Sequence, residues 1–141
     1  MSEQLLSEFK PLLRKGQFFI ADIENDVMIN TDLTIIERIL DNVIKNSINY
    51  GLLNSEIQFR LKNNKSKINL KIINSCNPLT TEQVKSVFEP FYRIDKARGT
   101  YNGGTGLGLY ITKNFVEKIG GKITFNYQHH KATIDIIFPL I

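Results

Sequence analysis

Cysteine and histidine are scarce in this sequence, and long hydrophobic runs are absent. The single cysteine, Cys76, excludes an internal disulfide framework and suits a reducing compartment. With only His129 and His130 besides, the chain lacks the spaced ligands of a structural zinc site. No apolar run approaches the roughly 18 residues that cross a bilayer, and the sequence opens without a signal-peptide pattern. These absences exclude a disulfide-rich scaffold, a Cys/His metal module and a membrane-spanning segment.

The composition that is present is typical of one globular domain. The 141 residues are 42% hydrophobic and 23% charged, which suits a single hydrophobic core. The formal net charge is +4, but the Lys and Arg residues are scattered rather than grouped in blocks. We therefore expect no nucleic-acid partner. A polyphosphate ligand, an acidic partner and a plain solvated surface are all compatible with this charge.

The spacing of apolar residues predicts an α+β fold. Helical spacing and capping residues predict helices over 1–15, 31–50, 81–88 and 106–120. Alternating and β-branched runs predict strands over 17–23, 27–30, 56–62, 67–74, 122–127 and 132–138. This order predicts a two-layer α/β sandwich: a mixed, largely antiparallel sheet of about five strands, covered on one face by about three helices.

A stripe of asparagines runs along the long predicted helix. At about 100° per residue, Asn42, Asn46 and Asn49 fall on one side, while Val43 and Ser47 lie well away from them. Asparagine is a poor helix former, so this placement needs an explanation. One interpretation is that the amides simply face water. The other is a neutral oxygen-donor face suited to Mg²⁺, which takes few protein ligands and leaves other positions to water and phosphates.

A glycine-rich run precedes the last predicted helix. The residues from Gly103 to Leu109 lead into a helix whose apolar residues recur at every fourth position. Free N–H groups at a helix start bind anions, and glycine lets that backbone approach a phosphate closely. The run is not a P-loop, because no Lys-Ser or Lys-Thr pair follows the last glycine. A phosphate-binding helix start and an ordinary structural turn both fit the run.

These segments occur in an order that resembles the catalytic domain of sensor histidine kinases, a family related to DNA gyrase, the large heat-shock chaperones and MutL. The similar parts are the N box (42–47), the F box (87–93), the second glycine box (104–109) and the last strand (134–139). The resemblance covers roughly 18–139, nearly the whole chain. It implies a Bergerat-type ATP-binding fold over residues 17–141, with ATP and Mg²⁺ as ligands.

The resemblance also implies a role for each matching residue. Asn46 would hold Mg²⁺ and, with Asn42 beside it, would form the catalytic pair; Tyr50 would lie near the nucleotide. The ATP lid would carry Tyr92, Arg93, Lys96 and Arg98, whose basic side chains suit phosphates. Further ATP contacts are implied for Asn74 in the first glycine box (74–78), for Leu79 directly after it, and for Gly104, Thr105, Gly106, Leu107, Gly108 and Leu109 in the second glycine box.

The chain departs from the family pattern at the first glycine box. Asn74 stands where the family has an aspartate that accepts a hydrogen bond from the adenine amino group. Cys76 and Pro78 replace the two glycines of that box, and Asn49 replaces a lysine that contacts phosphate. A neutral acceptor in place of a charged one costs about 1 kcal/mol or more, so we expect a reduced adenine affinity.

The resemblance further implies phosphotransfer rather than hydrolysis. ATP-hydrolysing relatives carry a glutamate at the position of Asn42, and an amide cannot act as a general base. A neutral histidine is already a nucleophile, so positioning and charge neutralisation would suffice. His129 and His130 lack the sequence setting of a phospho-acceptor. We therefore expect a protein-histidine kinase domain whose acceptor histidine lies outside this chain.

The resemblance implies two partners: the dimerisation and phospho-acceptor helices of the same kinase, and a cognate response regulator. Residues 1–16 would be a linker or helix that comes from the dimerisation domain. We expect the isolated domain to be monomeric, and to be the cytoplasmic domain of a membrane-anchored bacterial sensor kinase. The alternative is a degenerate nucleotide-sensing or scaffold module with weak or no kinase activity. A serine-directed anti-sigma-factor kinase is less favoured, because the F box is typical of sensor kinases.

Overall fold

A computed structural model of the chain describes residues 6–24, 33–64, 66–92 and 108–139, without the side chains of residues 33 and 64. Its elements are η1 (Lys10–Leu12), β1 (Phe18–Ile23), α2 (Leu33–Tyr50), β2 (Glu56–Asn64), β3 (Lys67–Ser75), α3 (Thr81–Ser86), α4 (Gly108–Lys118), β4 (Lys122–Gln128) and β5 (Lys131–Pro139). None of the helices in these ranges is long and apolar enough to span a membrane.

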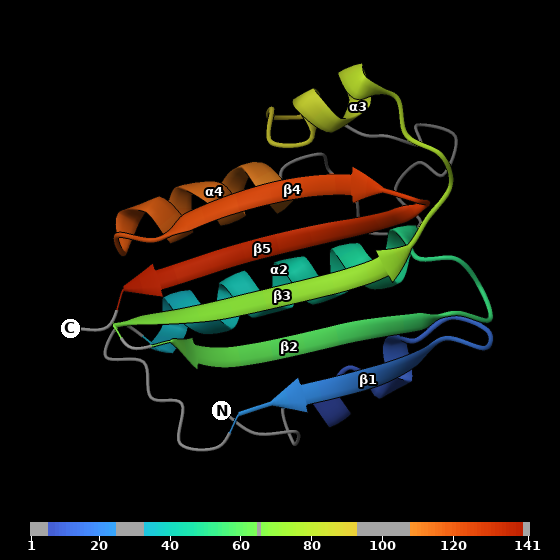
Figure 1. The fold of residues 1–141 in the computed structure, drawn as a ribbon, viewed down its shortest axis with the longest axis horizontal. Coiled ribbons are helices and arrows are strands. Elements are labelled where there is room, and N and C mark those ends of the chain that lie inside the picture. Colours follow the sequence, from blue (N-terminus) through green and yellow to red (C-terminus); the bar gives the residue numbers. More distant parts are fainter. Residues whose placement is uncertain (1–5, 25–32, 65, 93–107, 140–141) are drawn as a thin grey trace.

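The five strands form one mixed sheet in the order β1-β2-β3-β5-β4. Strand β1 pairs parallel with β2, and every other pairing is antiparallel. The parallel pair needs a crossover, which α2 supplies. Helices α2 and α4 lie behind the sheet in Figure 1, on one of its faces, and α3 lies beside β4. The predicted α+β sandwich with a five-stranded sheet is confirmed.

The core lies between the sheet and the two longer helices. Along β3, Ile68, Leu70 and Ile72 are buried and alternate with partly exposed residues, as expected of a strand covered on one face. On α2, Ile39 and Val43 have no exposed surface. Burying each such side chain contributes about 1.5–3 kcal/mol, so this interface accounts for much of the stability.

The helix predicted over residues 1–15 is wrong in its described part. Helical backbone ends at Ser7, a turn follows, and residues 10–12 form a 3₁₀ helix with Pro11 in its first turn. Proline lacks the N–H that a continuing α-helix needs, and its ring clashes with the preceding turn. Leu6 and Phe9 are buried, but Leu12 is 49% exposed. The strand predicted over residues 27–30 lies outside the described residues.

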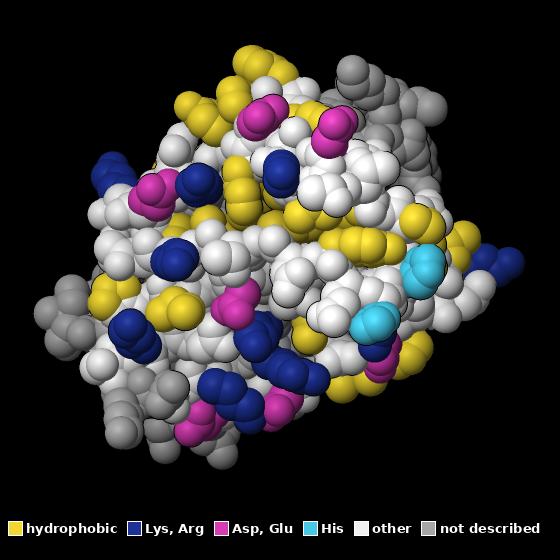
Figure 2. Space-filling model, turned by 45° about the horizontal axis from the view of Figure 1, so that its top comes forward, with side chains coloured by type: hydrophobic (Ala, Val, Ile, Leu, Met, Phe, Trp, Pro, Cys, Tyr) yellow, Lys and Arg dark blue, Asp and Glu magenta, His cyan; other side chains and the backbone are white. Residues whose placement is uncertain are grey.

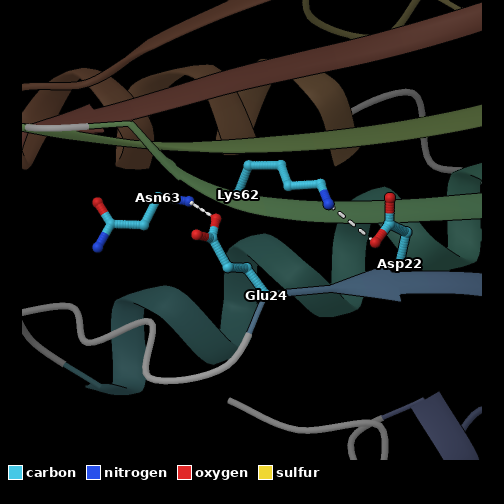
Figure 3. A network of polar contacts seen from close by, with 4 residues as sticks. All are labelled: Asp22, Glu24, Lys62 and Asn63. Atoms are coloured by element: carbon cyan, nitrogen blue, oxygen red, sulfur yellow. Dashed lines mark hydrogen bonds and ion pairs between the residues drawn. The ribbon is translucent and has the colours of Figure 1, made fainter.

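Polar contacts tie the edge strand β1 to β2 (Figure 3). The Lys62 ammonium lies 2.9 Å from an oxygen of Asp22, and the Asn63 backbone N–H donates to Glu24 Oε2 at 2.7 Å. Both carboxylates stand at the end of β1, so they favour the parallel register in which Asp22 lies beside Arg60. Exposed ion pairs contribute about 1 kcal/mol or less, so the backbone ladder contributes most of the pairing energy.

Candidate functional site

The asparagine stripe of α2 lies at the border of the core. Asn42, Asn46 and Asn49 are all half-buried, whereas Val43 and Ser47 on the other side are fully buried. The hydroxyl of Ser47 donates to the carbonyl oxygen of Val43 at 3.1 Å, so it is satisfied within the helix. The stripe therefore lies at the border between the core and the open surface. Ligand-binding side chains are expected at such a border.

An open cavity of about 550 Å³ lies between α2 and α4. Its lining residues are Thr34, Glu37, Arg38, Asp41 and Asn42 from α2, and Ile111 and Phe115 from α4. This volume is within the range of small-molecule sites. Of the sequence-predicted site residues, Asn42 lines the cavity; Asn46 and Tyr50 follow on α2, beyond its lining. The α2 spacing of three and four residues could have identified the other lining positions from the sequence.

Charges around the cavity are mixed. Asp41 lies 3.1 Å from Lys45 in a pair one helical turn apart, and both side chains are about half exposed. Arg38 is exposed next to Asn42 on the same stripe. Among the described residues, no group of three His, Cys, Asp or Glu side chains could hold a metal ion. The amide oxygens of Asn42 and Asn46 are the donor set here that fits Mg²⁺, a hard cation that prefers oxygen ligands.

Asn74 lies at the end of β3, on the face that the helices cover. It is 3% exposed, and its Nδ2 donates to the carbonyl oxygen of Ser75 at 3.1 Å. It also lies against the end of α2, because a Cβ on Gly51 would come 3.6 Å from the Asn74 Cβ. The tertiary structure thus brings Asn74 to the same end of α2 as Tyr50.

The backbone after Asn74 stays attached to the sheet. The N–H of Cys76 donates to the carbonyl oxygen of His130 at 2.9 Å, in the β4–β5 turn. Cys76 is buried, and this burial raises the pKa of its thiol. Leu79 is half-buried, and a capping box between Thr80 and Gln83 then starts α3. The segment predicted to be the first glycine box contains no glycine, and it is held in place by a backbone hydrogen bond to the β4–β5 turn and by the capped start of α3.

Of the segment predicted to be the second glycine box (104–109), the structure describes only the last two residues, Gly108 and Leu109. Gly108 begins α4 and its carbonyl oxygen accepts a hydrogen bond from Thr112 Oγ1 at 2.7 Å; Leu109 is buried in the core. Tyr92 is half-buried and is the one residue of the predicted lid that the structure describes. The other predicted residues of the lid and glycine box lie outside the described residues: Arg93, Lys96, Arg98, Gly104, Thr105, Gly106 and Leu107.

Comparison with known proteins matches this arrangement to one family. Residues 31–141 match the family of histidine kinase-, DNA gyrase B- and HSP90-like ATPases. The sensor protein VanSC of Enterococcus gallinarum is 34% identical over 140 residues, which are 99% of this chain and 38% of that protein. The sensor protein kinase WalK of Staphylococcus aureus is 34% identical over 122 residues, 84% of this chain and 29% of the relative. The chain therefore spans about a third of the length of these relatives.

Solved structures show the same fold. The catalytic domain of histidine kinase ThkA aligns with a TM-score of 0.82 and 26% identity, covering 97% of this chain and 88% of that domain. ThkA in complex with the response regulator TrrA aligns with a TM-score of 0.79 and 23% identity, covering 99% of this chain and 39% of that one. From its family match, its relatives and its fold, this chain belongs to the histidine kinase-, DNA gyrase B- and HSP90-like ATPases and is an ATP-binding catalytic domain of the sensor histidine kinase type.

Proposed function

We propose that this domain binds Mg–ATP between α2 and α4 and transfers the γ-phosphate to a histidine on a separate dimerisation and phospho-acceptor domain. The observation that carries the proposal is the half-buried amide face of α2 bordering the cavity between the helices. Neutral oxygen donors beside an open cavity suit a metal-bound polyphosphate.

Each residue has a proposed task. Asn46 holds Mg²⁺ through its amide oxygen, with Asn42 beside it, and bound Mg²⁺ neutralises charge on the phosphates. Tyr50 lies near the nucleotide, and the Asn74 carbonyl oxygen accepts from the adenine amino group. The lid residues Tyr92, Arg93, Lys96 and Arg98, Leu79 before α3, and the second glycine box from Gly104 to Leu109 complete the ATP contacts.

The proposed reaction needs no general base from α2. Asn42 stands where a hydrolase carries glutamate, and Asp41 is already paired with Lys45. In the transfer, a ring nitrogen of the acceptor histidine forms a bond to the γ-phosphorus while the bond to the β–γ bridging oxygen breaks, leaving ADP. The imidazole proton passes to solvent. Positioning and charge neutralisation are the contribution of this domain.

The acceptor is proposed to lie on another domain. His129 and His130 sit on the surface of the β4–β5 turn, where the histidines are coloured cyan in Figure 2. Both have positive φ angles, 52° and 61°, which suit a tight turn and not a phospho-acceptor helix. We propose that residues 1–16 connect to the dimerisation helices, and that the whole protein is a membrane-anchored bacterial kinase with this domain in the cytoplasm. A response regulator would be its downstream partner, and the isolated domain would be monomeric.

The second candidate is a degenerate nucleotide sensor or scaffold. The replacement of the adenine-binding aspartate by Asn74, and of two glycines by Cys76 and Pro78, favours it. Calorimetric titration with ATP, with and without Mg²⁺ and with GTP as control, separates the kinase from a scaffold that has lost nucleotide binding, and phosphotransfer to an acceptor domain separates it from a nucleotide sensor. Micromolar to low-millimolar binding that prefers ATP and depends on Mg²⁺ supports the kinase. No heat from a folded domain with any nucleotide would support the scaffold.

A further inference from the structure

A hydrogen-bonded turn with one buried side chain, Gln17, precedes β1. The Gln17 N–H donates to the Arg14 carbonyl oxygen at 3.0 Å, and Gly16 between them has a φ of 74°. In return the Arg14 N–H donates to the Gln17 side-chain oxygen at 2.8 Å. Gln17 is only 6% exposed, so this amide is fixed by its surroundings. Breaking one of the bonds of the buried Gln17 amide would leave a buried polar group unsatisfied, so these bonds favour one geometry of the turn.

The same two side chains bind the C-terminal end of α2. Arg14 Nη1 donates to the carbonyl oxygens of Asn49 at 3.0 Å and Gly51 at 3.3 Å. Gln17 Nε2 donates to those of Ile48 at 3.0 Å and Gly51 at 3.1 Å. The last carbonyls of a helix have no partner within the helix, and a cation there also interacts favourably with the helix dipole. Since α2 has no basic residue in its last turn, Arg14 supplies that charge from outside the helix.

Gly51 makes room for this contact. A Cβ there would lie 3.1 Å from Gln17 Nε2 and 2.6 Å from the carbonyl oxygen of Ser47. In Figure 1 the blue connection into β1 runs beside the green connection from α2 into β2, and the Asn54 N–H joins the two by donating to the Lys15 carbonyl oxygen at 3.0 Å. We call the pair Arg14 and Gln17, with the carbonyls they bind, the α2 clasp.

The α2 clasp borders the proposed nucleotide site. Tyr50 stands between the two bound carbonyls of Asn49 and Gly51, and Asn46 lies one turn earlier on α2. Asn74 also meets Gly51, since a Cβ on Gly51 would lie 3.1 Å from Gln17 Nε2 and 3.6 Å from the Asn74 Cβ. A shift of the last turn of α2 would therefore move Tyr50 relative to Asn74, and a misplacement of about 1 Å is costly for binding and catalysis.

We propose that Arg14 and Gln17 are positioning residues for the nucleotide site: they hold the last turn of α2 against Asn74 and thereby couple the docking of residues 6–17 to ATP affinity. The inference rests on the proposed function, because it assigns these residues to the site of ATP binding. Coupling is reciprocal, so bound ATP also stabilises the docked turn. A change in the segment before β1 then alters nucleotide affinity without touching the nucleotide.

The test uses Arg14→Met and Gln17→Met, which keep side-chain length and remove the donors. Both are expected to weaken Mg–ATP binding roughly tenfold, within the usual range for coupled sites. Arg14→Lys restores a cation and part of the affinity. The control is Asn69→Ala, which removes a part-buried amide bound to the Ile136 carbonyl oxygen on the opposite face of the sheet. It is expected to lower the melting temperature and leave ATP affinity unchanged.

Hydrogen exchange provides a second readout. If the α2 clasp only stabilised the fold, Mg–ATP would not change the exchange rates of its backbone N–H groups. Mg–ATP is expected to slow exchange of the Arg14 and Gln17 backbone N–H groups in the wild type, and not in Asn46→Ala. The outcomes separate the two proposals. If the wild type binds no ATP, the proposed function fails and this inference fails with it. If the wild type binds but folded Arg14 and Gln17 variants bind equally well, the function stands and the inference is overturned.

Discussion

Gly51 and Asn74 meet where the C-terminal end of helix α2 packs against the end of strand β3. A Cβ on Gly51 would come 3.6 Å from the Cβ of Asn74, but only 2.6 Å from the Ser47 carbonyl oxygen, closer than Cβ contacts normally come. Gly51 has no positive φ angle, so it is required by close packing and not by an unusual backbone conformation. This contact places the buried amide of Asn74 at the end of the helix that carries the asparagine stripe.

Gly51→Ala is expected to destabilise the domain by about 1–3 kcal/mol, because backbone must shift to relieve the overpacking. Chemical denaturation of the nucleotide-free domain measures the free energy of unfolding. Gly108→Ala is the matched control: among the described residues, nothing lies within 4 Å of its Cβ position, so alanine there should be neutral or stabilising. Equal stability of Gly51→Ala and the wild type would contradict the packing interpretation.

Asn74→Asp is expected to tighten ATP binding roughly fivefold, since a carboxylate accepts the adenine amino hydrogen more strongly than an amide by about 1 kcal/mol. It should also lower the melting temperature of the nucleotide-free domain, because a buried charge is introduced. Calorimetry and thermal unfolding with and without ATP measure both effects. Asn126→Asp, exposed on β4, is the control that should change neither. An unaltered or weaker ATP affinity would remove Asn74 from the adenine contact.

Asn46→Ala is expected to abolish the Mg²⁺-dependent part of ATP binding, because the amide oxygen proposed to hold the cation is lost. The measurement is the ratio of ATP dissociation constants with and without Mg²⁺. When the domain is joined to its acceptor domain, phosphotransfer should disappear as well, and the product in the wild type should be acid-labile phosphohistidine. If Asn46→Ala keeps the wild-type response to Mg²⁺, the metal is held elsewhere.

Cys76 makes stability depend on pH in the alkaline range. Burial raises the pKa of the folded thiol above the value of about 9.0 that the thiol has in the unfolded chain. The thiol is neutral in both states below that value, so its contribution is fully present there. As the pH rises through 9.0 the unfolded chain loses the proton first, and stability falls until the folded thiol also ionises. Cys76→Ala should therefore lose less unfolding free energy between pH 8 and about pH 10.5 than the wild type.

Much of the site could be predicted from local sequence. The alternation in β3 and the helical spacing in α2 are periodic patterns, which depend on neighbouring residues along the chain. The same spacing placed Asn42, Asn46 and Asn49 on one side of α2, and the structure describes all three at the border of the core. Pro11 carries equally local information: a proline at this position is incompatible with a continuous α-helix over residues 1–15.

Most of the described elements, their apolar sides and the asparagine stripe can be predicted from the sequence, because they follow from the spacing of residues within one helix or strand. Three features depend on how the whole chain packs: β1 runs parallel to β2, β5 lies between β3 and β4, and Arg14 binds the carbonyl oxygen of Asn49, 35 residues away. Such contacts depend on which surfaces meet when the whole chain packs, and the hydrophobic effect that drives packing is non-directional. Local sequence patterns do not specify which strands pair or which side chain contacts the end of α2. These contacts are specified by the close packing of the folded chain.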